Sequence, residues 1–138
     1  MKIPKNQIWY LIIFGSIAAT DYSGYSGSFL RMGTTARAIA MGSAFTAELD
    51  YGFSAYYNPA ATAFVESKRV NFAHQSLSLN RRLIAASYSM NLPPTAGIGI
   101  SWVSAGTDKI DGRSTSGQHT QYLSTSEDAL MVTFAQKL

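Results

Sequence analysis

The sequence predicts an all-β protein, the first part of an antiparallel transmembrane β-barrel in which about four strands are present. An apolar leader opens the chain, and short runs with a period of two follow in its second half. Charged residues make up only 14% of the chain, against roughly 25% in an ordinary soluble domain. Mean hydropathy is nevertheless +0.01, as expected where lipid-facing side chains alternate with side chains facing a polar lumen.

Residues 1–19 have the pattern of a secretory signal peptide. Lys2 and Lys5 precede an apolar run that starts at Ile8 and ends in small residues at Ala18 and Ala19. The run is shorter than the roughly 20 residues of a transmembrane helix, and a charged start with a small-residue exit is typical of an export signal. We expect cleavage near its last two alanines, and an uncleaved anchor is the less favoured alternative.

The charge balance argues against a nucleic-acid partner. The formal net charge is +3, and removing the two lysines of the leader leaves +1. Basic pairs occur at Lys68-Arg69 and Arg81-Arg82. They stand at the ends of apolar runs, where interface anchors or solvated turns are expected, whereas nucleic-acid-binding proteins gather Lys and Arg on one face. No nucleic-acid partner is therefore expected.

The clearest strand signal lies in residues 83–92, followed by a second in residues 96–104. In the first, one face carries Ile84, Ala86, Tyr88, Met90 and Leu92, and the other carries the small or polar residues Ala85, Ser87, Ser89 and Asn91. In the second, Ile98, Ile100 and Trp102 alternate with Gly97, Gly99 and Ser101. Between the two runs, Pro93-Pro94-Thr95 interrupts the ladder because proline has no N–H to donate. The two runs predict a hairpin with a tight turn.

Two further strands are predicted in residues 129–138 and 68–78, all within a barrel region that covers residues 67–138. The second of these is the weaker, because its apolar phase slips at Leu77 and Leu79. Residues 106–127 are polar and are predicted to form a long extracellular loop, since outer-membrane barrels place short turns on the periplasmic side and long loops outside.

A soluble β-sandwich would show the same period of two, because its apolar faces pack on each other. Three observations favour the barrel: Tyr88 and Trp102 lie on the apolar faces, the opposite faces carry small residues, and charged residues are few. Aromatic girdles on the outward face are typical of outer-membrane barrels. The sandwich remains open as the alternative.

The segment before the strands has two local signals. In residues 36–44 every second residue is small, which suits an extended chain, but Ala36, Ala40 and Ala44 also lie on one face of a helix. Both readings stay open. Further on, Asn58 can cap free N–H groups, and Pro59 stands in the first helical position, where its missing donor costs nothing. A helix is predicted to begin there.

Enzymatic sites are not predicted. His74 and His119 are the only histidines, and the chain has no cysteine, so a transition-metal site lacks its usual ligands. No serine stands in a Gly-x-Ser-x-Gly context, and Gly97-Ile-Gly99 lacks the remaining glycine and the following helix of a dinucleotide motif. We expect no catalytic residue, metal or cofactor.

One run of residues resembles a known family. It comprises Arg37-Ala38, Met41-Gly42-Ser43-Ala44-Phe45-Thr46-Ala47, Asp50 and Ala55-Tyr56-Tyr57-Asn58-Pro59-Ala60. This run resembles the N-terminal signature of PorV/PorQ proteins, which are similar to the FadL/TodX-type outer-membrane transport family. The chain departs from the signature at Ser43, where a second glycine is usual, and at Tyr51, where an acid often follows Asp50.

The resemblance implies a barrel of about fourteen strands, of which this chain would be an N-terminal fragment. Residues 20–66 would form a hatch or plug folded into the lumen, with Gly42, Asn58, Pro59 and Ala60 as hatch residues whose role is conformational. PorV-like members act with type IX protein secretion, and FadL-like members pass hydrophobic small molecules. The implied location is the bacterial outer membrane, and the implied partners are its lipid together with secretion-system proteins or hydrophobic ligands.

Overall fold

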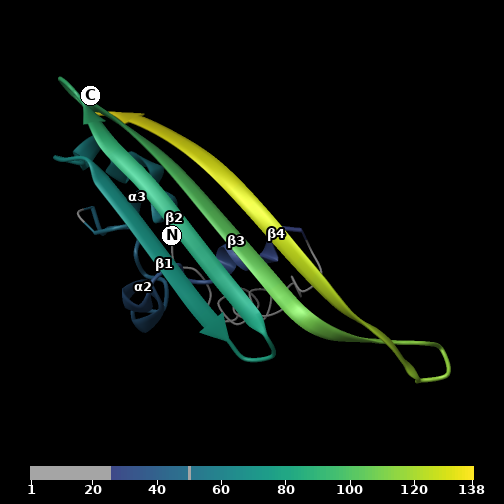
Figure 1. The fold of residues 1–138 in the computed structure, drawn as a ribbon. Coiled ribbons are helices and arrows are strands. Elements are labelled where there is room, and N and C mark those ends of the chain that lie inside the picture. Colours follow the sequence, from purple (N-terminus) through teal and green to yellow (C-terminus); the bar gives the residue numbers. More distant parts are fainter. Residues whose placement is uncertain (1–25, 50) are drawn as a thin grey trace, which may run out of the picture.

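A computed structural model describes residues 26–49 and 51–138, so the predicted leader lies outside the described residues. Four strands form one sheet in the order β1-β2-β3-β4, each antiparallel to the next (Figure 1). Their bounds are β1 (Arg69–Leu77), β2 (Arg81–Leu92), β3 (Ala96–Arg113) and β4 (His119–Gln136). The predicted antiparallel β architecture is confirmed. The sheet is open, and within the described part the outer edges of β1 and β4 pair with no further strand.

The predicted hairpin and the two flanking strands are all present. Phe72 of β1 pairs with Ala86 of β2, and Ala86 pairs with Trp102 of β3, so the expected faces are in register across three strands. The phase slip at the end of β1 has a local cause. Leu77 is still paired with Arg81, whereas Leu79 lies in the following turn with a positive φ of 62°.

The prediction of a long polar loop in residues 106–127 was wrong. β3 continues to Arg113 and β4 begins at His119, so only a short turn separates two strands of 18 residues each. The pairing shifts register between Thr107 and Ile110, and again next to Arg113. Backbone hydrogen bonds pair two strands whatever side chains the strands carry. A two-stranded ribbon with neither face buried therefore needs no alternation of apolar and polar residues. We call residues 107–125 the projecting hairpin.

Short helical turns precede the strands: η1 (Ser28–Arg31), α2 (Ala36–Ala40), α3 (Ser54–Tyr57) and η2 (Pro59–Phe64). Residues 26–49 and 51–65, the helical segment, lie against one face of the sheet (Figure 1). The open question about residues 36–44 is answered in favour of a helix for residues 36–40 only, and residues 41–44 form the turn after it. The first turn of this helix is capped by the Thr35 hydroxyl, which accepts from the Ala38 N–H at 3.1 Å. Among the described residues, no helix has the length and apolarity needed to cross a bilayer.

The core lies between the helical segment and the sheet. Phe29 and Phe53 from the helical segment pack with Leu83 and Ala85 of β2 and Val103 of β3. Since both rings come from segments that precede the sheet in the chain, the sheet face beneath them is covered by its own N-terminal neighbour. We call this side the covered face of the sheet.

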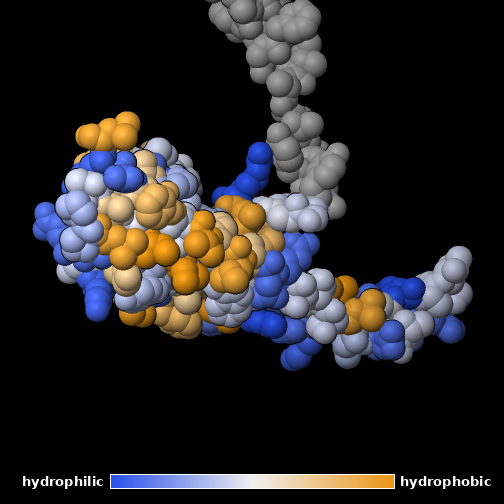
Figure 2. Space-filling view, turned by 90° about the horizontal axis from the view of Figure 1, so that it is seen from above, coloured by the Kyte–Doolittle hydropathy of each residue, from blue (hydrophilic) through white to orange (hydrophobic). Residues whose placement is uncertain are grey.

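The other side, the outward face, carries the large apolar side chains. Val70 is 80% exposed, Leu130 71% and Phe134 64%, whereas Ala85 and Ser101 on the covered face are 1% and 2% exposed. Hydrophobic side chains gather over the body of the sheet, while the projecting hairpin is mostly hydrophilic (Figure 2). Leu83 and Val103 are buried in the core, but most residues of the covered face are small or polar, and most of the large apolar side chains lie on the outward face.

Candidate functional site

The residues of the predicted hatch motif fall into two places. Asn58, Pro59 and Ala60 lie together at the start of η2, where the Asn58 Oδ1 accepts from the Ala60 N–H at 3.1 Å. The Asn58 Nδ2 also donates to the carbonyl of Thr46 at 3.0 Å. Asn58 thus caps one turn and ties it to the loop after α2. The predicted helix start at Pro59 is confirmed, as a 3₁₀ helix.

Gly42 lies apart from those three residues, at the end of α2. It has a left-handed φ of 61°, and its N–H donates to the carbonyl of Ile39 at 3.0 Å. Ser43 follows with a φ of 63° and donates to the carbonyl of Ala38 at 2.8 Å. Left-handed residues that return hydrogen bonds to the last turn are the usual way to end a helix. A second glycine at position 43 would fit this backbone, so the departure from the family pattern carries a local conformational cost.

The helical segment approaches the sheet closely at β3. A Cβ added at Gly97 would lie 1.9 Å from the carbonyl oxygen of Thr62, and one added at Gly99 would lie 2.7 Å from the Thr133 Oγ1. The hydroxyls of Thr62 and Thr133 are 3.2 Å apart, and the Thr133 hydroxyl donates to the carbonyl of Gly99 at 3.2 Å. The two glycines therefore make room for the backbone of η2, and the Thr62 and Thr133 hydroxyls meet where η2 lies on β3 and β4.

The sequence pattern placed Gly97 and Gly99 on the small-residue face of a predicted strand and excluded a dinucleotide motif, but it did not predict this docking contact. Their signal was present, because both glycines stand on the non-aromatic face of a predicted strand. In a strand interior, glycine marks a place where another backbone approaches closely. The identity of that backbone required the structure.

A second attachment joins the helical segment to β1. The Gln75 Nε2 donates to the carbonyl of Gly33 at 2.7 Å. A Cβ added at Gly52 would lie 2.3 Å from the Asn71 Oδ1, and the Asn71 Nδ2 donates to the Ser87 hydroxyl at 3.1 Å. Gln75 thus binds the helical segment to β1, and Gly52 leaves room for the Asn71 side chain of the same strand.

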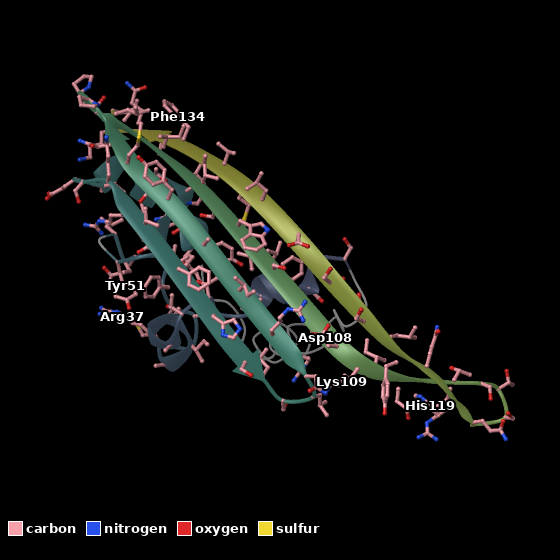
Figure 3. The ribbon with its side chains drawn as sticks, viewed as in Figure 1. Arg37, Tyr51, Asp108, Lys109, His119 and Phe134 are labelled. Carbon is pink, nitrogen blue, oxygen red and sulfur yellow. The ribbon has the colours of Figure 1, made fainter. Side chains whose placement is uncertain are left out.

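Aromatic side chains hold the helical segment together. Phe45 is fully buried, with its ring centroid 5.0 Å from that of Tyr57 and 5.7 Å from that of Tyr51. Arg37 lies over the Tyr51 ring at 4.9 Å and pairs with Glu48 at 3.0 Å, and Figure 3 shows Arg37 and Tyr51 side by side. We call residues 36–49 and 51–57 the lobe around α2, and these aromatic contacts form a small core within it.

Tyr56 fastens the lobe to η1. Its hydroxyl donates to the carbonyl of Leu30 at 2.6 Å. Burial, together with the neighbouring Tyr57, raises the pKa of the Tyr56 hydroxyl above its usual value of 10.0. The group stays protonated at neutral pH and keeps this hydrogen bond.

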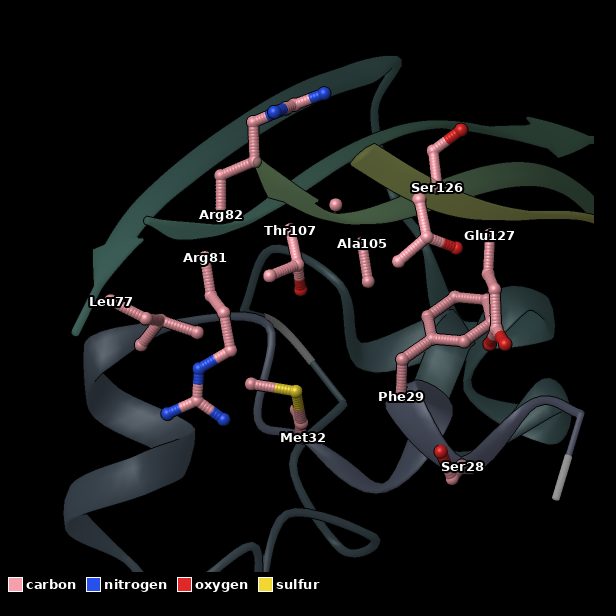
Figure 4. A pocket seen from close by; sticks show the side chains of 12 residues that line it. Ser28, Phe29, Met32, Leu77, Arg81, Arg82, Ala105, Thr107, Ser126 and Glu127 are labelled. Atoms are coloured by element: carbon pink, nitrogen blue, oxygen red, sulfur yellow. The ribbon is translucent and has the colours of Figure 1, made fainter. Parts of the chain in front are cut away.

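A pocket of about 240 Å³ opens between η1 and the covered face of the sheet (Figure 4). Phe29 and Met32 form one wall, and Ala105 and Thr107 of β3 form the other. The remaining lining residues are Ser28, Leu77, Arg81, Arg82, Gly106, Thr125, Ser126 and Glu127. The pocket is thus mainly apolar, and charged side chains stand at its margin.

The projecting hairpin carries a separate charged cluster. The Asp111 carboxylate pairs with the Arg113 guanidinium at 2.7 Å and with the His119 ring. The hydrogen bond from His119, followed by that from Arg113, lowers the pKa of Asp111 below its usual value of 3.8. Across residues 26–49 and 51–138, no group of three or more His, Asp or Glu side chains is placed to hold a metal ion.

Comparison with known proteins adds no relative. No family model, no curated protein and no solved structure matches this chain.

Proposed function

We propose that this chain forms part of an outer-membrane β-barrel of the PorV/PorQ type, with the helical segment as its internal hatch. One observation carries the proposal: apart from Leu83 and Val103 in the core, the covered face of the sheet holds mainly small and polar side chains, and most of the large apolar side chains are left uncovered on the other face. A soluble β-sandwich would do the reverse, because there the apolar faces pack together.

The dimensions of the outward face fit a bilayer. A transmembrane β-strand needs about 9–11 residues, and β1 and β2 have 9 and 12. At the end of this band nearer the projecting hairpin, the Trp102 indole N–H donates to the Asp128 carboxylate at 3.2 Å. An aromatic ring with its polar edge directed to a charged group is typical of the girdle at a membrane surface.

The free edges set a condition on the proposal. In hydrocarbon, each unsatisfied backbone group costs several kcal/mol, so sheets cross membranes only as closed barrels. The outer edges of β1 and β4 therefore pair with further strands in the proposed assembly. The same closure would place the covered face and the helical segment inside the lumen.

The role in type IX protein secretion rests on the projecting hairpin and on the resemblance of the helical segment to PorV/PorQ proteins. β3 and β4 have 18 residues each, about 59 Å at roughly 3.3 Å per residue, well beyond the depth of a bilayer core. The excess length presents a polar ribbon outside the membrane, where a protein partner can bind it.

Uptake of small molecules, as in FadL-like channels, is the second candidate. The pocket beside Phe29 favours it, because a mainly apolar cavity with polar groups at its margin is the usual form of a small-molecule site. The two candidates share the barrel and differ in whether the hairpin or the pocket carries the function.

Single-cysteine labelling tests the barrel directly, since the natural chain has no cysteine. In cells that express the protein, Val132→Cys on the outward face should resist a membrane-impermeant maleimide and react with a lipid-soluble one. Tyr122→Cys in the projecting hairpin should react with the impermeant reagent on intact cells. The protein should also fractionate with outer membranes.

Equal labelling of the two positions by the impermeant reagent, in a protein found in the soluble periplasmic fraction, would overturn the proposal. If the barrel holds, pull-down of secretion components through the hairpin, lost when residues 109–123 are replaced by a short turn, separates the secretion role from uptake.

A further inference from the structure

The pocket beside η1 has opposite charges at its two ends. Arg81 of β2 and Glu127 of β4 both line it, and the small side chains of Ala105 and Thr107 lie between them on β3. In Figure 4 the Arg81 guanidinium lies next to Met32, and the Glu127 carboxylate lies next to Phe29, on the far side of the cavity. The pocket therefore offers a cation at one end, a carboxylate at the other and apolar walls between them.

Strand register fixes how far apart these two residues are. Arg81 pairs with Thr107, and Thr107 pairs with Thr125, two residues before Glu127. With about 4.8 Å between strands and about 3.3 Å per residue, the two Cα atoms lie about 12 Å apart. The two side chains form no ion pair with each other, and a ligand several atoms long fits between their charges.

Neither charge is neutralised within the described part of the chain. The Arg81 guanidinium donates to the carbonyl of Ser78 at 3.1 Å and to its hydroxyl at 3.4 Å, both of them uncharged acceptors. Glu127 forms no ion pair among residues 26–49 and 51–138. By contrast, the neighbouring Arg82 is already paired with Asp108. The two charges at the pocket are thus available to a ligand.

We propose that this pocket binds a small zwitterion with an apolar body, of the size of a dipeptide. The free carboxylate of the ligand pairs with Arg81, its free amine pairs with Glu127, and its side chains contact Phe29 and Met32. A simple fatty acid would leave Glu127 without a partner. A volume of about 240 Å³ lies just below the usual range of about 300–1,000 Å³ for drug-sized ligands, which fits a ligand this small.

This inference deepens the proposed function and rests on it only for the route by which a ligand reaches the pocket. Binding itself needs the helical segment and the covered face, and both are measurable in detergent solution. A protein that inserts into outer membranes and binds nothing would overturn the inference alone. A protein that binds and is not in membranes would overturn the barrel alone.

The test uses the dipeptide alanyl-leucine and its blocked forms, titrated calorimetrically into the purified protein. We expect saturable binding of the free dipeptide. Acetylation of the amine or amidation of the carboxylate should each weaken binding about tenfold, since each removes one charge-assisted pair. Arg81→Gln should make the free dipeptide and its amide bind alike, and Glu127→Gln should make the free and acetylated forms bind alike.

Lys109→Gln and Glu66→Gln are matched controls, because each removes one charge of the same sign from an exposed position outside the pocket. Neither should change binding of the free dipeptide. Failure of the free dipeptide to saturate the protein would overturn the proposal. So would equal affinity of the acetylated and free forms for the natural protein, because that result would describe a site for simple acids.

Discussion

β3 and β4 run through both the body of the sheet and the projecting hairpin, yet their side chains follow different patterns in the two regions. In the body, β3 alternates Gly97, Gly99 and Ser101 with large apolar residues, and the helical segment covers the small side. In the hairpin, both faces of β3 and β4 are largely exposed, and charged pairs such as Arg113 with Asp111 replace packing. The contrast teaches that backbone pairing alone sustains a ribbon, whereas the side-chain pattern records what each face touches.

A charge placed on the outward face should break this comparison most strongly. We expect Val132→Lys to destabilise the protein folded in a bilayer, lowering its free energy of unfolding by about 2–4 kcal/mol, the cost of a lysine near the membrane midplane. Tyr122→Lys, in the hairpin, should cost almost nothing because water already surrounds that position. Urea titration of the two variants in lipid vesicles measures both values, and similar costs would contradict the proposed membrane boundary.

The next effect concerns the covered face. Gly97→Ala places a Cβ 1.9 Å from the carbonyl of Thr62, so η2 must move away from β3, at an expected cost of about 1–3 kcal/mol. Gly106→Ala is the control on the same strand, because its Cβ meets only the end of the Arg82 side chain, at 2.8 Å. Denaturant unfolding of the two variants checks the difference, and an equally large loss in both would show that η2 is not held at Gly97.

Removal of the Asn58 side chain should loosen the covering segment by a smaller amount. Asn58→Ala deletes the cap on Ala60 and the hydrogen bond to Thr46, and such caps are worth about 0.5–2 kcal/mol. We expect faster proteolysis within residues 46–60 and unchanged protection of β2. Asn58→Asp keeps the cap and loses only the donor to Thr46, so its loss should be the smaller of the two. A larger loss in Asn58→Asp would be inconsistent with a capping role.

Ser43→Gly should stabilise the lobe around α2. Ser43 has a left-handed φ of 63°, which costs about 1–2 kcal/mol for a residue with a Cβ. Glycine returns part of that gain through its greater freedom in the unfolded chain, so the net gain should be about 0.5–1 kcal/mol. Hydrogen exchange at the Ser43 N–H, compared with a Ser54→Gly control in α3, measures it. Slower exchange in the control alone would contradict the backbone argument.

The smallest effect sharpens the hairpin side of the comparison. Hydrogen bonds from His119 and Arg113 lower the pKa of Asp111 in the folded hairpin below 3.8, so the charged carboxylate stabilises the hairpin tip. That contribution is present above about pH 4 and is lost as pH falls through the folded pKa. Ring resonances of His119 and Tyr122, followed by NMR, should shift together in this acid range. Asp111→Asn should remove the dependence, and its persistence in that variant would assign it to another group.

The body of the sheet was predictable because its two faces have different surroundings. Ile84 to Leu92 and Ile98 to Trp102 alternate with small residues, and this alternation by itself marks both strands. The helix start at Asn58-Pro59 was also predictable, since capping chemistry is local. Both signals depend only on near neighbours in the chain.

The hairpin and the docking contacts could not be found in that way. Residues 107–125 face water on both sides, so their polar composition resembled that of a loop. The contact of Gly97 with Thr62 and the pocket that joins Phe29 to Glu127 both bring distant parts of the sequence together. Single-sequence patterns hold no information on such pairings, because no periodicity links the partners.

The burial of small residues beneath the helical segment has a consequence for how this sequence can change over time. At Ala85 and Ser101 added volume has no space to occupy, whereas at Ile100 or Val132 any long aliphatic group serves equally well. Tolerance to mutation should therefore rise and fall at every second position along one strand. Substitutions should therefore accumulate at the outward-facing positions, while the alternate, covered positions change slowly. In relatives of this chain, sequence identity should then differ between odd-numbered and even-numbered positions of the same strand.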